Sequence, residues 1–377
     1  MTRERNPNSD KLKILLFMPS LDRDKQLELF IENTNFDLEI IAIASHSTAL
    51  IDYCRSRKIP LHTINHSKGL INFFKTQFKL KKVIRDFAPN LVESHSFLPG
   101  LYLGIFKILD YLFRSPQFSM ANFRHHNLNH HLKRRRRAIF LDKFIYTFHD
   151  TTVVPSSSTF SVLLAEGCNI HRLALIPHQL NSTAIQSSKE LELPKYSIAS
   201  NKYELIAVGR LDWQKNYALM MSVLSLLKSD FKNFRLRIFG SGSVRSREDL
   251  LKLVHEFALD DFVVLENWTS SIEIEILRSD VFLHTAIDES FGLVLAESLA
   301  LGTPVVSNWM GGARDIASMS CTNIPGNSAE ELYQLLKETL LDLANVSVET
   351  RAQSFEFLAR LNSLDLQLLH ERLVKTQ

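Results

Sequence analysis

The chain has 377 residues, of which 45% are hydrophobic and 23% charged, with a net charge of +3. A chain of this length exceeds one ordinary hydrophobic core, so we expect two domains. The balanced composition, without any low-complexity tract, excludes a disordered chain and indicates a globular protein.

The sequence predicts no targeting or membrane-spanning segment. In residues 1–17 the apolar run follows several charges and no small-residue cleavage site follows it, so we expect no signal peptide. The most apolar stretch, residues 101–113, is too short to span a bilayer and carries two charges. The three cysteines form no metal or redox motif, which is typical of a reducing compartment. These features predict a cytoplasmic protein.

Apolar, strand-like runs alternate with amphipathic helical patterns in the first half of the chain. We expect strands at 13–17, 38–44, 91–94, 118–123 and 173–176, and helices at 69–86, 98–112 and 136–148. Residues 178–202 are polar and rich in serine, and within them we expect a linker at 183–202.

The same alternation resumes in the second half. Strands are expected at 203–209, 236–240, 262–265, 281–285 and 303–307. Strand–helix alternation in both halves predicts two α/β domains with parallel sheets, at residues 1–182 and 203–355. A C-terminal helix at 356–377 is expected to pack back onto the first domain.

In such folds ligands bind beyond the carboxyl ends of the strands, so the loops that follow the strands are candidate sites. The strand at 203–209 is followed by GRLDWQKN. Gly209 would let a ligand approach the backbone, and Arg210 and Lys215 could converge on a diphosphate. A plain turn with solvated charges explains these residues equally well. The next strand ends in FGSGS, where Gly240 begins a glycine-rich turn that could also only cap a helix.

The stretch DESFGLVLAES, residues 288–298, places two carboxylates around a helix start. Amides of Gly292, Leu293 and Val294 would face an anion there. Glu289 could accept hydrogen bonds from sugar hydroxyls, and Glu297 could take both hydroxyls of a ribose. A solvated helix face is the alternative. A functional site is favoured because four such loops, including GGARD at 311–315, leave strand ends in one domain.

These residues resemble the donor-binding domain of the retaining glycosyltransferases of family 4, which have the GT-B fold. The matching segments, over roughly residues 203–320, are GRLDWQKN, DESFGLVLAES and LALGTPVVSNWMGGARDI. The resemblance implies that Arg210 and Lys215 contact a diphosphate, Glu289 the sugar and Glu297 the ribose. The remaining donor-binding residues that it implies are Gly209, Gly240, Ser290, Phe291, Gly292, Leu293 and Val294.

The resemblance also implies a reaction. A sugar would pass from a nucleotide-sugar donor to a glycan or lipid-linked glycan acceptor, with retention at the anomeric carbon, in cell-envelope polysaccharide or glycolipid synthesis. No cofactor and no metal are expected, because Arg210 and Lys215 would stabilise the departing diphosphate. A nucleotide-sugar epimerase of the same fold and a catalytically silent binding subunit are the alternatives. The sequence does not identify the sugar, the base or the acceptor.

The first half resembles the family less closely. Residues 17–26 have no glycine where the family often has a Gly-Gly loop, which weakens any role for that loop. His95 lies in SHSFLPGLY, and His125 and His126 lie in ANFRHHNLNHH. The resemblance implies that His125 contacts the transferred sugar or the acceptor, with His95 and His126 nearby. Metal binding is disfavoured because no carboxylate neighbours these histidines in the sequence.

The positive charge is concentrated in residues 1–190, which carry a net charge of +10 against −7 for the remainder. Residues 68–85 place Phe73, Phe74 and Phe78 among Lys75, Lys79, Lys81 and Lys82, and KRRRR follows at 133–137. Such a helix suits the interface of an anionic membrane, although a buried aromatic stripe gives the same pattern. Nucleic acid is not expected as a partner.

Overall fold

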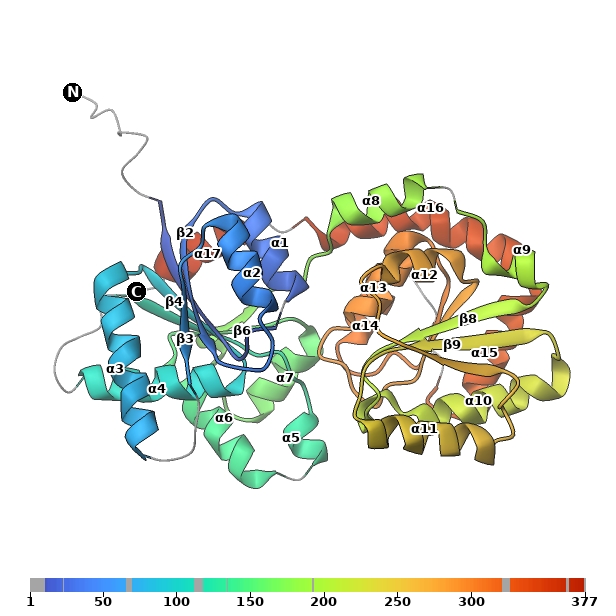
Figure 1. Ribbon diagram of the computed structural model, residues 1–377, viewed down its shortest axis with the longest axis horizontal. Coiled ribbons are helices and arrows are strands. Elements are labelled where there is room, and N and C mark those ends of the chain that lie inside the picture. Colours follow the sequence, from blue (N-terminus) through green and yellow to red (C-terminus); the bar gives the residue numbers. More distant parts are fainter. Residues whose placement is uncertain are drawn as a thin grey trace. The chain divides into compact units, whose positions relative to one another are not determined.

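The computed structural model describes residues 11–22, 24–65, 70–111, 118–133, 135–191, 193–320, 326–363 and 366–375. The predictions on residues 1–10 and on Cys321 therefore lie outside the described residues, as do Lys68 and Arg134 of the two basic segments. The chain divides into two compact units, residues 1–177 with 364–377, and residues 178–363. Both are built on parallel sheets (Figure 1).

In its described part, the first unit has a seven-stranded parallel sheet of order β3-β2-β1-β4-β5-β6-β7. The strands are β1 (Lys13–Met18), β2 (Asp37–Ile43), β3 (Leu61–Ile64), β4 (Leu91–His95), β5 (Ser119–Phe123), β6 (Thr151–Val154) and β7 (Leu173–Leu175). The helices between them are α1 (Lys25–Asn33), α2 (Ala49–Arg57), α3 (Leu70–Phe87), α4 (Phe97–Tyr111), α5 (Asn129–Leu132), α6 (Arg136–Phe148), α7 (Ser157–Ala165) and the 3-10 turn η1 (Ile170–Arg172).

Helices cover both faces of this sheet, because alternate residues of its central strand enter two different cores. Ile14 and Leu16 of β1 pack with α1 and α2, whereas Leu15 and Phe17 pack with α3 and α4. All four side chains are fully buried. Burial on both faces explains why this strand reads as one continuous apolar run.

Two strands of the first sheet, β3 and β6, were not expected from the sequence. The edge strand β3 reads LHTI and is only half-buried along most of its length. The inner strand β6 begins with Thr151 and Thr152. Short strands with polar residues lack the apolar run by which the other strands are recognised.

In its described part, the second unit has a five-stranded parallel sheet of order β10-β9-β8-β11-β12. Its strands are β8 (Tyr203–Val208), β9 (Phe234–Phe239), β10 (Val263–Glu266), β11 (Val281–His284) and β12 (Val305–Ser307), all of which the sequence predicted. The helices are α8 (Ser182–Glu190), α9 (Tyr196–Ser200), η2 (Trp213–Lys215), α10 (Tyr217–Asp230), α11 (Val244–Glu256), α12 (Ile272–Arg278), α13 (Leu293–Leu301), α14 (Ala313–Met319), α15 (Ala329–Leu341) and α16 (Leu343–Leu361).

Residues 183–202, expected to be a linker, are instead part of the second unit. Helix α8 lies against α12 and α13, beside α16 (Figure 1). Its Ile185 is buried in the core, and Lys189 Nζ donates a hydrogen bond to Ser354 Oγ at 2.8 Å. One buried apolar side chain anchors this polar helix, which is too little to give a helical pattern in the sequence. The change between units falls at Pro177 and His178.

The C-terminal helix returns to the first unit, as the sequence predicted. The final helix α17 (Leu366–Lys375) contacts α1 and β5, and its Leu373 enters the core formed with Ile14 and Leu16. The expected start at residue 356 falls within α16, which remains part of the second unit and ends at Leu361. Within the described residues, no helix combines the length and the apolar character needed to cross a bilayer.

Candidate active site

The loops after β8 and β11 meet in a buried ion pair. Lys215 ends the short turn η2, which Asp212 caps by accepting a hydrogen bond from the Gln214 amide at 3.0 Å. The Lys215 ammonium lies 2.5 Å from Glu289 Oε1, and the side chains are only 17% and 16% exposed. The structure therefore brings together two residues that the sequence assigned to separate contacts with a donor.

Two glycines allow close backbone approach in the loops after β8 and β9. A Cβ added at Gly209 would lie 2.6 Å from Lys215 Cε, so the lysine stem runs over bare backbone. A Cβ at Gly240 would lie 1.8 Å from the Gly209 carbonyl oxygen. The Gly209 amide also donates to the Phe239 carbonyl at 3.0 Å. Both positions therefore require glycine because neighbouring chain segments approach the backbone closely there, whether or not a ligand also binds.

Glu289 is held as a carboxylate by two groups. Burial alone would raise its pKa, but the Lys215 charge and the His284 ring lower the pKa of Glu289 to about 2. His284 ends β11, is almost fully buried, and has its Nε2 3.1 Å from Glu289 Oε1. Both of these contacts are to Oε1, and neither involves Oε2. Sequence reasoning did not single out His284, and its only signal was a histidine at the end of an apolar strand.

The surroundings of His284 fix its hydrogen positions. The Trp309 amide donates to Ser307 Oγ at 3.0 Å, and Ser307 Oγ lies 3.4 Å from His284 Nδ1. A charged carboxylate only accepts, so His284 Nε2 carries the hydrogen that faces Glu289 and Nδ1 is the acceptor. Burial lowers the pKa of His284, which favours this neutral ring. The histidine therefore orients Glu289 through a directional chain that starts on the backbone of Trp309.

The turn after Glu289 leads into α13 as the sequence predicted. Gly292 has φ of +96° and precedes the first helical residue, Leu293. The Gly312 amide donates to the Glu289 carbonyl at 2.7 Å, which fastens the two glycine-containing turns together. The first amides of a helix have no partner within the helix, so this end of α13 suits an anion.

The side chains around this turn are mainly structural. Phe291, predicted to bind the donor, is 1% exposed in the core of the second unit, and its ring meets the His178 ring edge-on at 5.4 Å. Leu293 and Val294 pack partly on the same core. These three residues can offer a donor only their backbone, which the side chains hold in place. Ser290 and Glu297 are half-buried, with Glu297 in the second turn of α13.

Arg210 faces its own loop. Its guanidinium lies 3.4 Å from Asp212 and 3.2 Å from Gln214 Oε1, and its side chain is 73% exposed. Both contacts of Arg210 are with exposed or half-buried groups, so replacing them with contacts to a ligand would cost little free energy. The predicted contact of Arg210 with a diphosphate stays a prediction, for which its long side chain would have to turn.

In the first unit, two of the predicted histidines are in contact. His95 ends β4 and His125 follows β5, and the pairing of these neighbouring strands brings the rings together. His95 Nδ1 lies 3.3 Å from His125 Nε2, and the rings stack with centroids 5.5 Å apart. Behind them, the buried Glu93 carboxylate lies 3.4 Å from His95 Nε2 and 3.0 Å from His370 Nε2. Sequence reasoning did not single out Glu93 or His370.

His126 belongs to a different, buried network. Its Nε2 lies 3.2 Å from Asp142 Oδ2, and its carbonyl accepts a hydrogen bond from Arg124 at 3.1 Å. Arg124 also pairs with Glu166 at 2.9 Å, and the same carboxylate lies 2.6 Å from His131. The expectation that no carboxylates support these histidines was wrong, because Asp142 and Glu166 come from α6 and the end of α7, distant in sequence. In the described part of the chain, no group of three or more His, Cys, Asp or Glu side chains could hold a metal ion.

Comparison with known proteins agrees with this geometry. Residues 188–353 match the family model described as glycosyl transferases group 1. This segment, most of the second unit, is therefore similar to the family. An uncharacterised glycosyltransferase of Methanocaldococcus jannaschii is 22% identical over 62% of this chain and 59% of its own length. A Campylobacter jejuni relative, N-acetylgalactosamine-N,N'-diacetylbacillosaminyl-diphospho-undecaprenol 4-alpha-N-acetylgalactosaminyltransferase, is 34% identical over 30% of each chain. The chain thus matches less than two thirds of the length of these relatives.

Solved structures extend the likeness to both units. HepE of Anabaena, crystallised with UDP, has a TM-score of 0.79 at 13% identity, over 97% of this chain and 100% of its own. Sucrose-phosphate synthase of Thermosynechococcus elongatus has a TM-score of 0.75 at 16% identity, with the same coverage. The fold is therefore GT-B, as the sequence predicted.

The matched segment includes the loops that carry Arg210, Lys215, Glu289 and Glu297. His95, His125 and His126 precede the matched segment, so the family match leaves their roles untested.

Helix α3 has one aromatic residue in the core and two on the surface. Phe73 stacks on Tyr102 with centroids 5.6 Å apart, in the core between α3 and α4. Ile71, Phe74 and Phe78 are instead 73%, 50% and 73% exposed. At 100° per residue these three share one face of α3 with Lys75 and Lys82, which are also exposed. We call this surface the α3 face, and it consists of Ile71, Phe74, Lys75, Phe78, Lys79, Lys81, Lys82 and Arg85.

Proposed function

We propose that the protein is a retaining glycosyltransferase that transfers a sugar from a nucleotide-sugar donor to a glycan or lipid-linked glycan, in cell-envelope polysaccharide or glycolipid synthesis. The observation that carries the proposal is the buried pair of Lys215 and Glu289 beside the start of α13. A cation, a fixed carboxylate and a helix start, all at the carboxyl edge of one parallel sheet, suit a sugar attached to a diphosphate.

In this mechanism the donor replaces the contact between Lys215 and Glu289 with its own contacts to each of them. The diphosphate takes the Lys215 ammonium and the amides at Gly292 and Leu293, while Arg210 turns from Asp212 to add a second cation. Glu289 Oε2 accepts hydrogen bonds from the sugar hydroxyls, and His284 keeps the carboxylate in place. The positive groups stabilise the charge that develops on the leaving phosphate, so the chemistry needs no metal ion.

Retention follows when the acceptor enters on the face that the phosphate leaves. The bond from the anomeric carbon to the phosphate oxygen breaks, and a bond to the acceptor oxygen forms on the same face. The leaving phosphate takes the proton of the acceptor hydroxyl. No protein base is then required, and the proposed role of His125 is to contact the transferred sugar or the acceptor.

The comparisons support a nucleotide-sugar donor and a lipid-linked acceptor. HepE has been crystallised with UDP and with UDP-glucose. The Campylobacter relative is named for a diphospho-undecaprenol acceptor. We infer the same classes of donor and acceptor for this chain.

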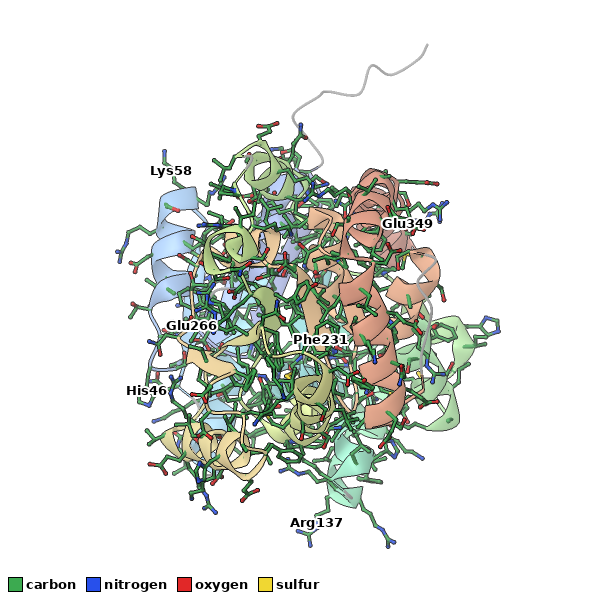
Figure 2. All side chains as sticks on the ribbon, turned by 90° about the vertical axis from the view of Figure 1, so that its right-hand side faces the viewer. His46, Lys58, Arg137, Phe231, Glu266 and Glu349 are labelled. Atoms are coloured by element: carbon green, nitrogen blue, oxygen red, sulfur yellow. The ribbon has the colours of Figure 1, made fainter. Side chains whose placement is uncertain are left out.

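The α3 face supports a membrane location for the acceptor. Three exposed apolar side chains would enter the interface of a bilayer, and the lysines beside them would meet anionic headgroups. A further exposed cluster, Lys133 with Arg135, Arg136 and Arg137, adds charge at the start of α6, where Arg137 projects outward (Figure 2). We therefore propose a peripheral association with an anionic membrane surface.

A ligand screen followed by a product assay tests the proposed function. Thermal unfolding would be measured with UDP, GDP, ADP and their sugars, because a ligand that binds only the folded state raises the midpoint. With the donor so found and membrane lipid extract as acceptor, a transferase releases free nucleotide only when the acceptor is present. An epimerase converts the donor without acceptor, and a silent subunit binds without either reaction. The anomeric configuration of the product, measured by NMR, separates retention from inversion.

A further inference from the structure

Glu93 is a buried carboxylate between two histidines of the first unit, one from its own strand and one from the C-terminal helix. It lies in β4, is 1% exposed, and contacts His370 of α17 through Oε1 and His95 of its own strand through Oε2. His95 in turn contacts His125 at 3.3 Å. Phe123 stacks on His95 at 4.7 Å and on His370 at 6.1 Å, so the rings form one layer. The result is a continuous row, His370–Glu93–His95–His125.

The charge of Glu93 gives the row a direction. Burial would raise the pKa of Glu93, but contact with His370 and His95 lowers the pKa of this carboxyl to about 2. A carboxylate has only acceptors, so the ring nitrogens that face Glu93 in these two ion-pair contacts are the ones that carry hydrogens, although neither Glu93 Oε1 nor His95 Nε2 meets hydrogen-bond geometry. With its hydrogen on Nε2, His95 has Nδ1 as an acceptor, and His125 Nε2 is then the donor across the 3.3 Å contact.

The two ends of the row differ in exposure. His370 and Glu93 are almost fully buried, whereas His125 is half-buried. The nearby Ser94–His149 pair is also almost fully buried, and His149 Nδ1 lies 2.7 Å from the Ile145 carbonyl within the core. Burying a carboxylate is costly, and a purely apolar contact between α17 and the sheet would avoid that cost. This cost indicates that the row has a function beyond packing, and that the function lies at its half-buried residue, His125.

We propose that His370 is a positioning residue for the transfer reaction, and that it acts through Glu93 and His95 to fix the ring orientation and tautomer of His125. The proposal rests on the proposed contact of His125 with sugar or acceptor. It gives the C-terminal return helix a function, because α17 supplies the histidine that fixes the carboxylate. Without His370, the Glu93 carboxylate loses the contact on Oε1 that holds its orientation, and so no longer faces His95 in one fixed position.

The test replaces members of the row in the full-length protein. His370→Phe keeps an aromatic ring in the layer, His370→Gln keeps a nitrogen donor near the Nε2 position, and Glu93→Gln removes the charge. We expect His370→Phe and Glu93→Gln to lower kcat by about tenfold or more, as loss of a partner that orients a histidine does elsewhere. His370→Gln should restore most of this loss. Donor affinity should be unchanged in all three, because the donor binds in the second unit.

Two controls keep the test independent of stability and of the proposed function. The ¹⁵N shifts of the imidazole nitrogens report the tautomers of His95 and His125 directly, in folded protein and without turnover. His255→Gln, an exposed histidine of the second unit paired with Asp260, controls for loss of a histidine and should change neither readout.

The outcomes separate the two proposals. If His125→Ala keeps full activity, the proposed role of His125 fails. If His125→Ala loses activity while His370→Phe and Glu93→Gln keep both kcat and the wild-type tautomers, the positioning proposal is overturned. Should His370→Phe fail to fold, the tautomer shifts and kcat of Glu93→Gln and His370→Gln decide the question alone.

Discussion

The Lys215 ammonium and the Glu289 carboxylate lie 2.5 Å apart although 74 residues separate them in the chain. Each is mostly shielded from water, so each depends on the other for compensation of its charge. A donor diphosphate can take over the ammonium only if the carboxylate keeps a second contact. His284 supplies that contact at 3.1 Å. Glu289 therefore keeps a hydrogen bond from His284 when the Lys215 ammonium turns toward a diphosphate.

Replacing the two cations should separate catalysis from stability. Lys215→Ala and Arg210→Ala should each lower kcat more than tenfold, or by more than ~1.4 kcal/mol of transition-state stabilisation, because each removes a charge from the leaving phosphate. Lys215→Ala should also lose on the order of 3 kcal/mol of unfolding free energy, since it leaves Glu289 buried without its ammonium. Arg210→Ala should keep wild-type stability, because the guanidinium is exposed. Near-normal turnover in both folded variants would remove these residues from the site.

His284→Phe should lower kcat by about tenfold or more by releasing the Glu289 carboxylate, with an unchanged dissociation constant for the nucleoside diphosphate. His284→Gln, which keeps a donor near the Nε2 position, should recover much of the lost rate. Steady-state kinetics together with calorimetric binding of the nucleotide make the comparison. Equal kcat in His284→Phe and wild type would show that Lys215 alone holds Glu289.

As the pH falls, the free energy of unfolding should decrease first through His149 and then, at lower pH, through Glu93 and Glu289. His149 is fully buried, and this burial lowers the pKa of His149 to about 4 from 6.5. Between these values the unfolded chain binds a proton that the folded chain does not. The contribution is therefore complete above pH 6.5 and is lost as the pH falls to about 4, by at most ~1.4 kcal/mol per pH unit. The Glu93 and Glu289 contributions are lost lower, between about 4.5 and 2, because both pKa values are lowered.

Thermal unfolding midpoints between pH 7.5 and pH 4.5 measure the His149 contribution. His149→Gln should show a flatter dependence than wild type, even if its midpoint at neutral pH is lower. His255→Gln, in which the exposed ring is replaced, should keep the wild-type slope. Equal slopes in wild type and His149→Gln would contradict the assignment to this buried ring.

Transferase activity should survive treatment with a chelator. The expectation follows from the assignment of charge stabilisation to Lys215, Arg210 and the start of α13. Activity would be measured after EDTA treatment and desalting, with and without added Mg²⁺ or Mn²⁺. A loss on chelation that either ion restores would contradict the proposed metal-independent chemistry.

The sequence predicted all five strands described in the second unit, because each is a run of apolar residues followed by a glycine, a charge or a turn. It predicted which loops carry Lys215 and Glu289 but not their contact, since a motif does not show where a side chain 74 residues away will lie. His284 reads as an ordinary strand residue. His370 lies on an amphipathic helix, and its contact with Glu93 depends on how α17 packs on the sheet. Such long-range pairs have no local signal.

Membrane binding through the α3 face should depend on both its lysines and its exposed phenylalanines. Wild-type protein should sediment with anionic liposomes at low salt and dissociate as salt rises, because each surface lysine contributes about 1 kcal/mol at best and salt screens it. Replacing Lys79, Lys81 and Lys82 with Ser should weaken binding at low salt. Replacing Phe74 and Phe78 with Ser should remove whatever binding persists at high salt. Phe73 is not a useful target, because it stacks on Tyr102 in the core.

The matched control for the aromatic pair is the double replacement of Leu341 and Val348 with Ser. These apolar side chains are each 67% exposed, but they lie on α15 and α16 of the second unit. This control should bind liposomes like wild type, and every variant should keep its nucleotide affinity because the donor site is in the second unit. If wild-type protein ignores anionic liposomes even at low salt, the α3 face does not contact a membrane and a soluble acceptor replaces the lipid-linked one. If the control loses binding as strongly as the Phe74 and Phe78 variant, general surface hydrophobicity and not the α3 face accounts for the interaction.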